Sequence, residues 1–185
     1  MPALPESVPP SKTEVNPNPL PPPRYALRPA TDADEAAVRD VIFSVLREHG
    51  LTPSPEDTDA DLFDIARHYH ARGGCFDVLI EETGGKIVGT VGLHPHEPGT
   101  VELRKMYLLP EHRGCGCGRY LLEHALAEAR RRGFRRIILE TTGKLPKAVA
   151  LYRQFGFRPY RAAHCAPRCD QTMELHLGES EPGGV

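Results

Sequence analysis

Hydrophobic and polar positions follow two different periods along this chain. Apolar residues recur at helical spacing across residues 38–46, directly after Thr31–Asp34, a sequence that is typical of a helix start. A short strand is expected at Tyr25–Leu27, before that helix, and a second helical pattern lies within residues 58–73. The chain then changes to short runs rich in β-branched and aromatic residues, which are typical of strands.

Glycine and proline divide the rest of the chain into further elements. Thr83-Gly84-Gly85 predicts a hairpin that opens a three-stranded antiparallel meander, and Glu97-Pro98-Gly99 predicts the turn to its third strand. The meander strands are expected at residues 76–80, 87–93 and 101–108. The later elements are a long helix through 121–132, a strand at 136–139, a helix from Pro146 to Gly156 and a strand at 172–177. The fold class is therefore α+β, a mixed, mostly antiparallel sheet flanked by helices, in the order β-α-α-β-β-β-α-β-α-β.

The start of the chain differs in composition from the rest. Residues 1–23 are dominated by proline and offer almost no apolar surface to bury, so we expect a disordered arm there. The 185 residues suffice for one well-buried core but not for two ordinary domains. We therefore expect one domain over residues 24–178 and a short tail at residues 179–185.

Charge and hydropathy exclude several classes of function. The 23 lysines and arginines nearly balance the 25 aspartates and glutamates, so the net charge of −2 gives no reason to expect nucleic acid or an anionic membrane as a partner. No apolar run approaches the roughly 20 residues that cross a bilayer. Since no secretory signal is recognised at the start, the default expectation is a cytoplasmic protein.

Five cysteines raise the question of a disulfide or a metal site. Their odd number and the lack of a secretory signal indicate reduced thiols. Cys115-x-Cys117 and His164-Cys165-x3-Cys169 contain residue types that bind metals, but their spacing differs from the usual zinc pairs and the first pair lies in a glycine-rich loop. We therefore expect no metal. A Cys/His metal-binding module is the alternative, which elemental analysis would test.

The stretch with the clearest chemical meaning joins the meander to the long helix. It contains three glycines, no acidic residue from 113 to 122, and the positive charge of Arg113. Glycines allow the backbone to wrap closely around a ligand, and the free N–H groups of the following helix favour a phosphate. We interpret this loop as a pyrophosphate site. The residues expected to bind the cofactor there are Arg113, Gly114, Cys115, Gly116, Cys117, Gly118 and Arg119.

Two common nucleotide-binding motifs do not fit this loop. A Walker A loop needs lysine followed by serine or threonine after its last glycine, where this chain has Arg119-Tyr120. A Rossmann fingerprint belongs to a parallel βαβ unit, whereas this loop follows an antiparallel meander. A glycine-rich turn that merely joins strand to helix is the remaining alternative.

Two motifs together resemble the GCN5-related N-acetyltransferase (GNAT) superfamily. The family signature Arg/Gln-x-x-Gly-x-Gly/Ala stands here as Arg113-x-x-Gly116-x-Gly118, and a helix ending in Leu-Tyr-x-x-x-Gly-Phe stands as residues 151–157. The resemblance covers roughly residues 25–177. Leu145 departs from it, since many members carry asparagine seven residues before the tyrosine. The resemblance implies a GNAT-like fold and an N-acetyltransferase that moves the acetyl group of acetyl-CoA to a primary amine.

The resemblance also implies roles for individual residues. Tyr152 would donate a proton to the departing thiolate, and the backbone around Met106 and Leu108 would pair with the pantetheine arm of acetyl-CoA. Glu102 is the candidate base, because strand alternation puts it on one face with Arg104, Met106 and Leu108, and some relatives carry a catalytic glutamate there. Each has a structural alternative, Glu102 as a partner of Arg104 and Tyr152 as a packing residue.

The reaction and its acceptor leave alternatives open. We favour direct attack in a ternary complex over an acyl-cysteine at 115 or 117, because no base is placed beside those thiols. A non-catalytic acyl-CoA-binding sensor is the alternative function. The acceptor is a small-molecule or peptide amine, and the acidic residues between 56 and 64 would either attract a cationic amine or simply favour a helix start. A homodimer is compatible with the sequence.

Overall fold

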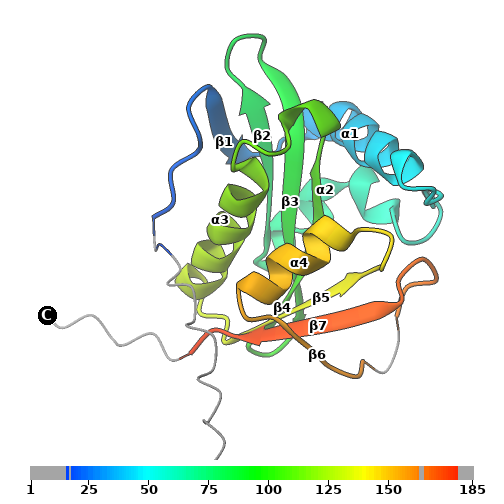
Figure 1. Cartoon of the computed structure of the whole chain (residues 1–185), viewed down its shortest axis with the longest axis vertical. Coiled ribbons are helices and arrows are strands. Elements are labelled where there is room, and N and C mark those ends of the chain that lie inside the picture. Colours follow the sequence, from blue (N-terminus) through cyan, green and yellow to red (C-terminus); the bar gives the residue numbers. More distant parts are fainter. Residues whose placement is uncertain (1–15, 17, 163–164, 179–185) are drawn as a thin grey trace, which may run out of the picture.

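The computed structural model describes residue 16, residues 18–162 and residues 165–178. Most of the predicted proline-rich arm (residues 1–15 and 17), the whole predicted tail (residues 179–185) and His164 lie outside the described residues. The rest of the chain builds one mixed sheet with helices packed on it (Figure 1). None of the helices in these ranges is long and apolar enough to cross a membrane.

The strands of the described chain lie in the order β1-β2-β3-β4-β5-β7-β6. Their bounds are β1 Tyr25–Pro29, β2 Cys75–Glu81, β3 Lys86–Glu97, β4 Thr100–Leu108, β5 Arg136–Thr141, β6 Arg158–Pro159 and β7 Gln171–His176. Neighbouring strands are antiparallel except β4 and β5, which run parallel. The predicted α+β class, the meander β2-β3-β4 and the mostly antiparallel sheet are confirmed, and the short edge strand β6 is an addition to the predicted order.

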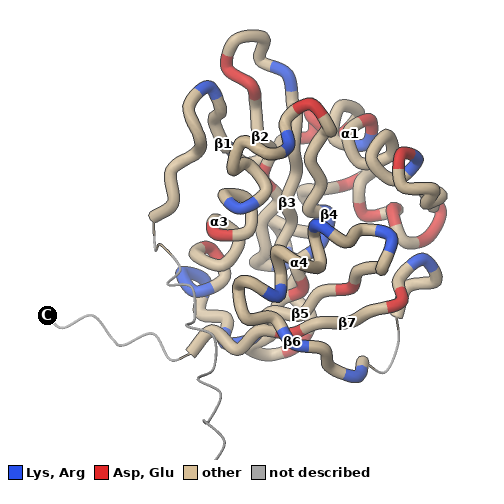
Figure 2. Tube along the Cα trace, viewed as in Figure 1, with Lys and Arg blue, Asp and Glu red and all other residues tan. Residues whose placement is uncertain are grey.

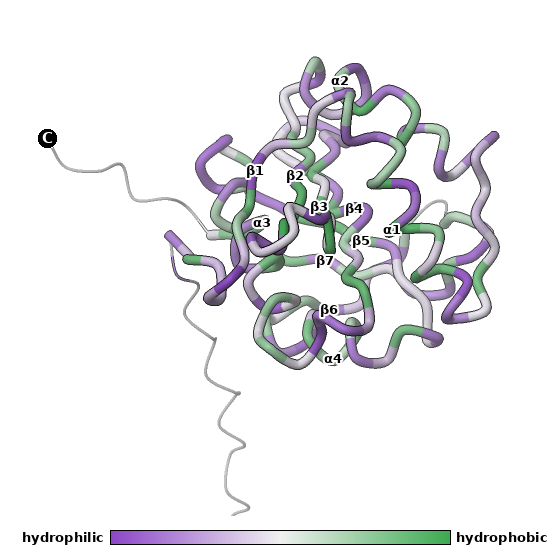
Figure 3. The backbone as a smooth tube through the Cα atoms, turned by 90° about the horizontal axis from the view of Figure 1, so that it is seen from above, coloured by the Kyte–Doolittle hydropathy of each residue, from purple (hydrophilic) through white to green (hydrophobic). Residues whose placement is uncertain are grey.

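Helices cover both faces of the sheet. The α-helices of the described chain are α1 Glu35–Glu48, α2 Ile65–His68, α3 Cys117–Arg131 and α4 Pro146–Gln154. Single 3-10 turns span Asp32–Asp34, Ala60–Phe63, His70–Arg72 and Pro110–His112. Both α1 and α3 contact β3 and β4. On β3, Gly89 faces Leu121 of α3, and Gly92 faces Tyr69 on the opposite face of the sheet. Hydrophobic residues therefore concentrate in the central strands (Figure 3).

The start of α1 follows directly from its sequence. Thr31 and Asp34 form the predicted capping box, in which the Thr31 N–H donates to Asp34 Oδ2 at 2.8 Å. Arg28 on β1 binds the same carboxylate at 2.6 Å and so ties the helix start to the sheet. The apolar residues spaced along 38–46 are buried against the strands, and Gly50, with a φ of +64°, follows the end of the helix.

The second helix is much shorter than predicted. Residues 58–73 instead form a 3-10 turn, the one-turn helix α2 and another 3-10 turn. The break lies at Asp64, whose φ of −163° and ψ of 70° are not helical and whose side chain accepts a hydrogen bond from the Arg67 N–H at 3.0 Å. Asp61 is buried and accepts a hydrogen bond from the Tyr69 hydroxyl at 2.6 Å. Polar contacts inside the protein therefore override the helical pattern.

Two features of β4 open the sheet. Its ladder with β5 covers only residues 100–102, so the two strands part beyond Glu102. Lys105 has a φ of +53°, and the pairing with β3 shifts between Arg104 and Tyr107, which marks a bulge. The strict alternation expected from Glu102 to Leu108 is interrupted at this bulge.

Candidate active site

A groove lies where β4 and β5 part. Residues 106–108 of β4 line one side, and residues 144–148 with Leu151, at the start of α4 and along it, line another. The loop residues 113–114 and Gly118 in the first turn of α3 line its end. Of the residues predicted to bind the cofactor, the groove brings together Met106, Leu108, Arg113, Gly114 and Gly118.

The glycine loop has the backbone geometry of an anion site. Gly114 and Gly116 adopt φ values of +78° and +91°, which residues with a side chain rarely adopt. Gly116 is the N-cap of α3, and the first turn of that helix contains no acidic residue. The N–H groups of this turn have no partners within the helix, so the helix dipole and its donors favour a phosphate at this end.

The Arg113 side chain already has hydrogen-bond partners within the protein, which the sequence did not indicate. Its Nη1 and Nη2 atoms each lie 2.8 Å from a carboxylate oxygen of Glu48 at the end of α1, and its Nε donates to the Leu108 carbonyl at 2.9 Å. The hydrogen bonds from Arg113 hold the pKa of Glu48 below its usual value. The loop itself contains no acidic residue, but Glu48 of α1 balances part of the positive charge of Arg113.

The other predicted loop side chains do not line the groove. Cys117 is fully buried in the core, and Cys115 Sγ lies 3.3 Å from Cys117 Sγ. Arg119 bonds Glu123 one turn further along α3 at 2.8 Å and stacks over the Phe155 ring. The side chains of Cys115, Cys117 and Arg119 are therefore engaged within the protein rather than directed into the groove.

A second, smaller pocket adjoins the groove. It contains Glu102 and Tyr152, and it shares Met106, Tyr107 and Leu145 with the groove. The two predicted catalytic residues, which are 50 positions apart in the sequence, therefore lie in one pocket at the parting of β4 and β5. The structure places Tyr152 on α4 and Glu102 at the last position of β4 that pairs with β5.

Burial sets the protonation of both candidates. Burial raises the pKa of Glu102, and Arg104, whose Nε lies 3.7 Å from Glu102 Oε1, opposes that rise only in part. Burial likewise raises the pKa of Tyr152, and the neighbouring Tyr107 adds to the effect. Glu102 is thereby a stronger base than an exposed glutamate, and Tyr152 keeps its hydroxyl proton at neutral pH.

A buried charge cluster borders this pocket and had no signal in the sequence. Asp59 is fully buried, and Arg168 donates two hydrogen bonds of 2.6 Å to its carboxylate. Lys105 Nζ lies 2.5 Å from Asp59 Oδ1 and 3.2 Å from Asp61 Oδ1. Burial alone would raise the pKa of Asp59, but Arg168 and Lys105 outweigh it and hold the pKa well below its usual range. These partners are 109 and 46 residues away, so no spacing rule reveals them.

The acidic segment between α1 and β2 is mostly engaged inside the protein. Acidic residues follow one another along it (Figure 2). Asp59 and Asp61 are buried beside basic groups, and Asp64 caps α2. Of the acidic residues in this segment, Glu56 and Asp57 alone are exposed and have no such structural role. Contacts within the protein therefore account for most of these acidic residues better than attraction of a cationic amine does.

Comparison with known proteins agrees with this geometry. Residues 41–157 match the acetyltransferase (GNAT) family. The uncharacterized N-acetyltransferase YjgM of Escherichia coli K12 is 38% identical over 145 residues, which cover 76% of this chain and 86% of YjgM. An acetyltransferase of the GNAT family from Staphylococcus aureus Mu50 has a similar fold, with a TM-score of 0.78 at 22% identity over 83% of this chain and 99% of that one.

A second solved structure carries a ligand. The GNAT-superfamily phosphinothricin acetyltransferase of Sinorhizobium meliloti, in complex with acetyl-CoA, has a TM-score of 0.67 at 25% identity over 85% of this chain and 91% of that one. The family match spans both the glycine loop before α3 and the tyrosine of α4. This chain belongs to the GNAT acetyltransferase family and is an N-acetyltransferase.

Proposed function

We propose that the protein transfers the acetyl group of acetyl-CoA to a primary amine by direct attack in a ternary complex. The observation that carries the proposal is the continuity of two pockets, since the groove and the pocket of Glu102 and Tyr152 share Met106 and Tyr107. A long thioester in the groove would present its acetyl group where these two side chains meet. The Sinorhizobium meliloti relative solved with acetyl-CoA supports this choice of donor.

The residues of the groove suit the parts of acetyl-CoA. The first-turn N–H groups of α3 and the left-handed glycines 114 and 116 suit the pyrophosphate. The apolar side chains of Met106, Leu145 and Leu151 suit the pantetheine arm. That arm would lie along the part of β4 that has left its ladder with β5, in the manner of an added strand.

The pocket supplies the two proton transfers that the reaction needs. The amine nitrogen forms a bond to the acetyl carbon while the carbon–sulfur bond breaks. Glu102, a base strengthened by burial, takes a proton from the attacking amine, directly or through one water. Tyr152 gives its hydroxyl proton to the departing sulfur and regains one from solvent as Glu102 releases its own.

Direct attack accounts for the loop cysteines better than an acyl-cysteine does. Cys117 is fully buried, and Cys115 Sγ contacts the His112 carbonyl at 3.0 Å rather than lining the groove. Neither thiol therefore has a position suited to attack on a thioester held along β4. We expect Cys115→Ser to keep the transfer rate within about threefold of wild type, since a nucleophile would be worth far more.

The experiment that tests the function is coenzyme A release with a panel of primary amines. The panel contains polyamines, amino acids, aminoglycosides and short peptides, each incubated with acetyl-CoA and the full chain. The proposal expects thiol release that depends on one class of amine, with the acetylated amine found by mass spectrometry. Tight acetyl-CoA binding without transfer to any amine would instead support the acyl-CoA sensor.

A further inference from the structure

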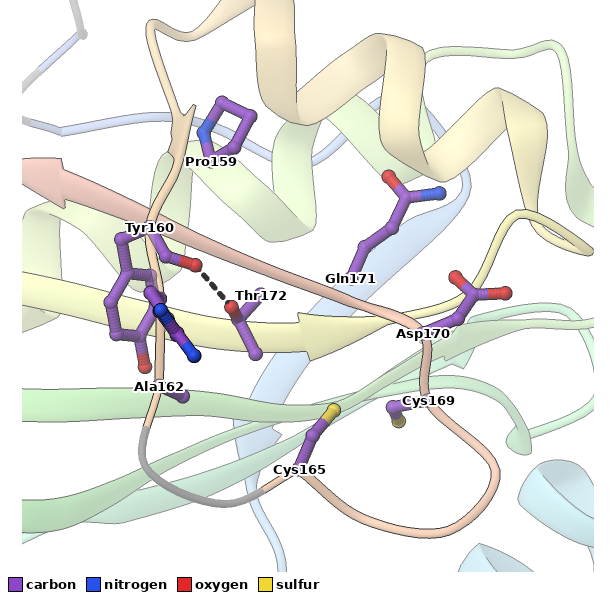
Figure 4. A pocket seen from close by; sticks show the side chains of 9 residues that line it. Pro159, Tyr160, Ala162, Cys165, Cys169, Asp170, Gln171 and Thr172 are labelled. Atoms are coloured by element: carbon purple, nitrogen blue, oxygen red, sulfur yellow. Dashed lines mark hydrogen bonds between the residues drawn. The ribbon is translucent and has the colours of Figure 1, made fainter.

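The loop between β6 and β7 brings two thiols to a carboxylate of the sheet. The Sγ atoms of Cys165 and Cys169 and a carboxylate oxygen of Glu140 all lie within 4.8 Å of one another. Figure 4 shows the two cysteines beside each other where the loop enters β7, in a hollow that Asp170 also lines. Glu140 belongs to β5, so the cluster joins a rigid strand to a connecting loop.

Backbone hydrogen bonds hold these three groups in place. The Ala166 N–H donates to Glu140 Oε2 at 2.9 Å, and the Cys169 N–H donates to the Ala166 carbonyl at 2.8 Å, which closes a turn between the cysteines. Asp170 accepts from the Gly143 N–H at 2.9 Å and fixes the far end of the loop. These bonds fix the Glu140 carboxylate and the backbone from Ala166 to Asp170, which carries Cys169 and directly follows Cys165.

The surroundings of the cluster are acidic. Glu102 lines the same pocket as Glu140 and Cys169, and Asp170 directly follows Cys169. Arg168, the basic residue between the two cysteines, is turned to Asp59 by two hydrogen bonds of 2.6 Å. Arg161 also lines the hollow of the two cysteines, so one basic group faces the carboxylates of Glu140 and Asp170 there. Carboxylates close to a pair of thiols favour a cation between them.

We propose that Glu140, Cys165 and Cys169 bind one Zn²⁺ ion. Thiolate ligands select a soft or borderline cation over magnesium or calcium, and zinc accepts a tetrahedral set of two sulfurs, one oxygen and one water. Tetrahedral zinc holds two thiolate sulfurs about 3.8 Å apart, so the ligands need close by only about 1 Å. Each thiol loses its proton to solvent as its sulfur forms a bond to the metal.

The site would fix one side of the pocket of Glu102 and Tyr152. Glu140, Cys169 and Arg168 line the pocket that holds Glu102 and Tyr152, and both cysteines flank the segment that carries Arg168. A zinc ion would link this segment to β5 and keep Arg168 hydrogen-bonded to Asp59. The sequence shows the two cysteines four residues apart but gives no sign of Glu140, because the carboxylate comes from a strand 25 residues before Cys165.

The test measures metal binding by the reduced full chain and its variants. Elemental analysis and titration with Co²⁺, whose thiolate complexes absorb in the near ultraviolet, report the metal without any assay of activity. We expect one zinc or cobalt ion per chain. Cys165→Ser/Cys169→Ser should weaken binding at least about a hundredfold, because both thiolates are lost. Glu140→Gln should weaken it by about tenfold or more, while keeping an oxygen to accept the Ala166 N–H.

The other close thiol pair of the described chain supplies the matched control. Cys115→Ser/Cys117→Ser removes the pair whose sulfurs are 3.3 Å apart and should leave metal binding unchanged. Absence of metal binding by reduced, folded protein would overturn the proposal, as would binding that is lost in this control but survives Cys165→Ser/Cys169→Ser. A Cys165–Cys169 disulfide in native protein, with no zinc bound after reduction, would likewise overturn it.

Discussion

Glu102 owes its candidate role to its surroundings rather than to its residue type. Burial raises the pKa of its carboxyl group, with Arg104 opposing and Glu140 adding to the rise. A carboxylate with a raised pKa is a better proton acceptor at neutral pH than an exposed one. The same ion pair with Arg104 was the structural alternative, and the structure contains both features at once.

Replacing Glu102 tests which feature matters. Because its pKa is raised, Glu102 is in its basic form only above that raised value, so single-turnover transfer by the wild type should fall as pH decreases through it. Glu102→Gln should lower the rate at neutral pH by about a hundredfold and abolish this acid limb. Glu82→Gln, at an exposed glutamate of the β2–β3 hairpin, is the control. An acid limb that persists in Glu102→Gln would assign it to another group.

At the scale of elements, the start of α3 carries the proposed cofactor site. Gly118 lies in the first turn and lines the groove, and a Cβ added there would meet no atom within 4 Å. Gly118→Glu would place a negative charge where the helix N-terminus should hold pyrophosphate, without the backbone strain of a change at Gly116. Calorimetry should show acetyl-CoA affinity lowered at least tenfold, about 1.4 kcal/mol.

The matched control for this element is Gly118→Ala. Alanine adds a side chain without charge and should leave the affinity within about threefold while stabilising the helix by about 0.5–1 kcal/mol. Wild-type affinity in both the alanine and the glutamate variants would show that the pyrophosphate does not bind at this loop. A loss in both would show that space, not charge, limits binding at this position.

Helices, strands and turns could be predicted from the sequence where short-range signals such as caps, turn residues and prolines determine them. The capping box at Thr31, the hairpin at Gly84-Gly85 and the proline that opens α4 all lie where the pattern put them. The helix expected over 58–73 is interrupted at Asp64 and shortened to α2, and the buried hydrogen bond from Tyr69 to Asp61 is a contact that periodicity does not reveal. The same limit hid Glu48 from the analysis of Arg113, since the two are 65 residues apart.

At the scale of the molecule, the Asp59 cluster ties three distant segments together. Asp59 on the segment after α1 binds Lys105 of β4 and Arg168 of the β6–β7 loop. Asp59→Asn leaves the partly buried Arg168 without its carboxylate and leaves the buried Lys105 with Asp61 alone, so we expect a loss of about 3–5 kcal/mol in the free energy of unfolding. Urea denaturation measures it, and Asp57→Asn, at an exposed position two residues earlier, should change it by no more than about 0.5 kcal/mol.

The pH dependence of stability gives a second readout for this cluster. Because the folded pKa of Asp59 is lowered, its contribution is fully present above the unfolded value of about 3.9 and is lost as pH falls from there through the folded value. The wild type should therefore lose more stability than Asp59→Asn between pH 5 and pH 3. Equal losses would mean that Asp59 is not the group that links acid to unfolding.

The proposed acetyl transfer depends on proton donation by Tyr152, which lies where the groove meets the pocket of Glu102. The measurement that tests it most directly is the single-turnover rate of acetyl transfer by Tyr152→Phe, which keeps the buried ring and removes only the hydroxyl. The control is Tyr160→Phe, whose residue lines neither the groove nor the pocket of Glu102. We predict a rate lowered about a hundredfold for Tyr152→Phe at an unchanged Kd for acetyl-CoA. A Tyr152→Phe rate equal to that of the wild type would contradict the account and make Tyr152 a packing residue.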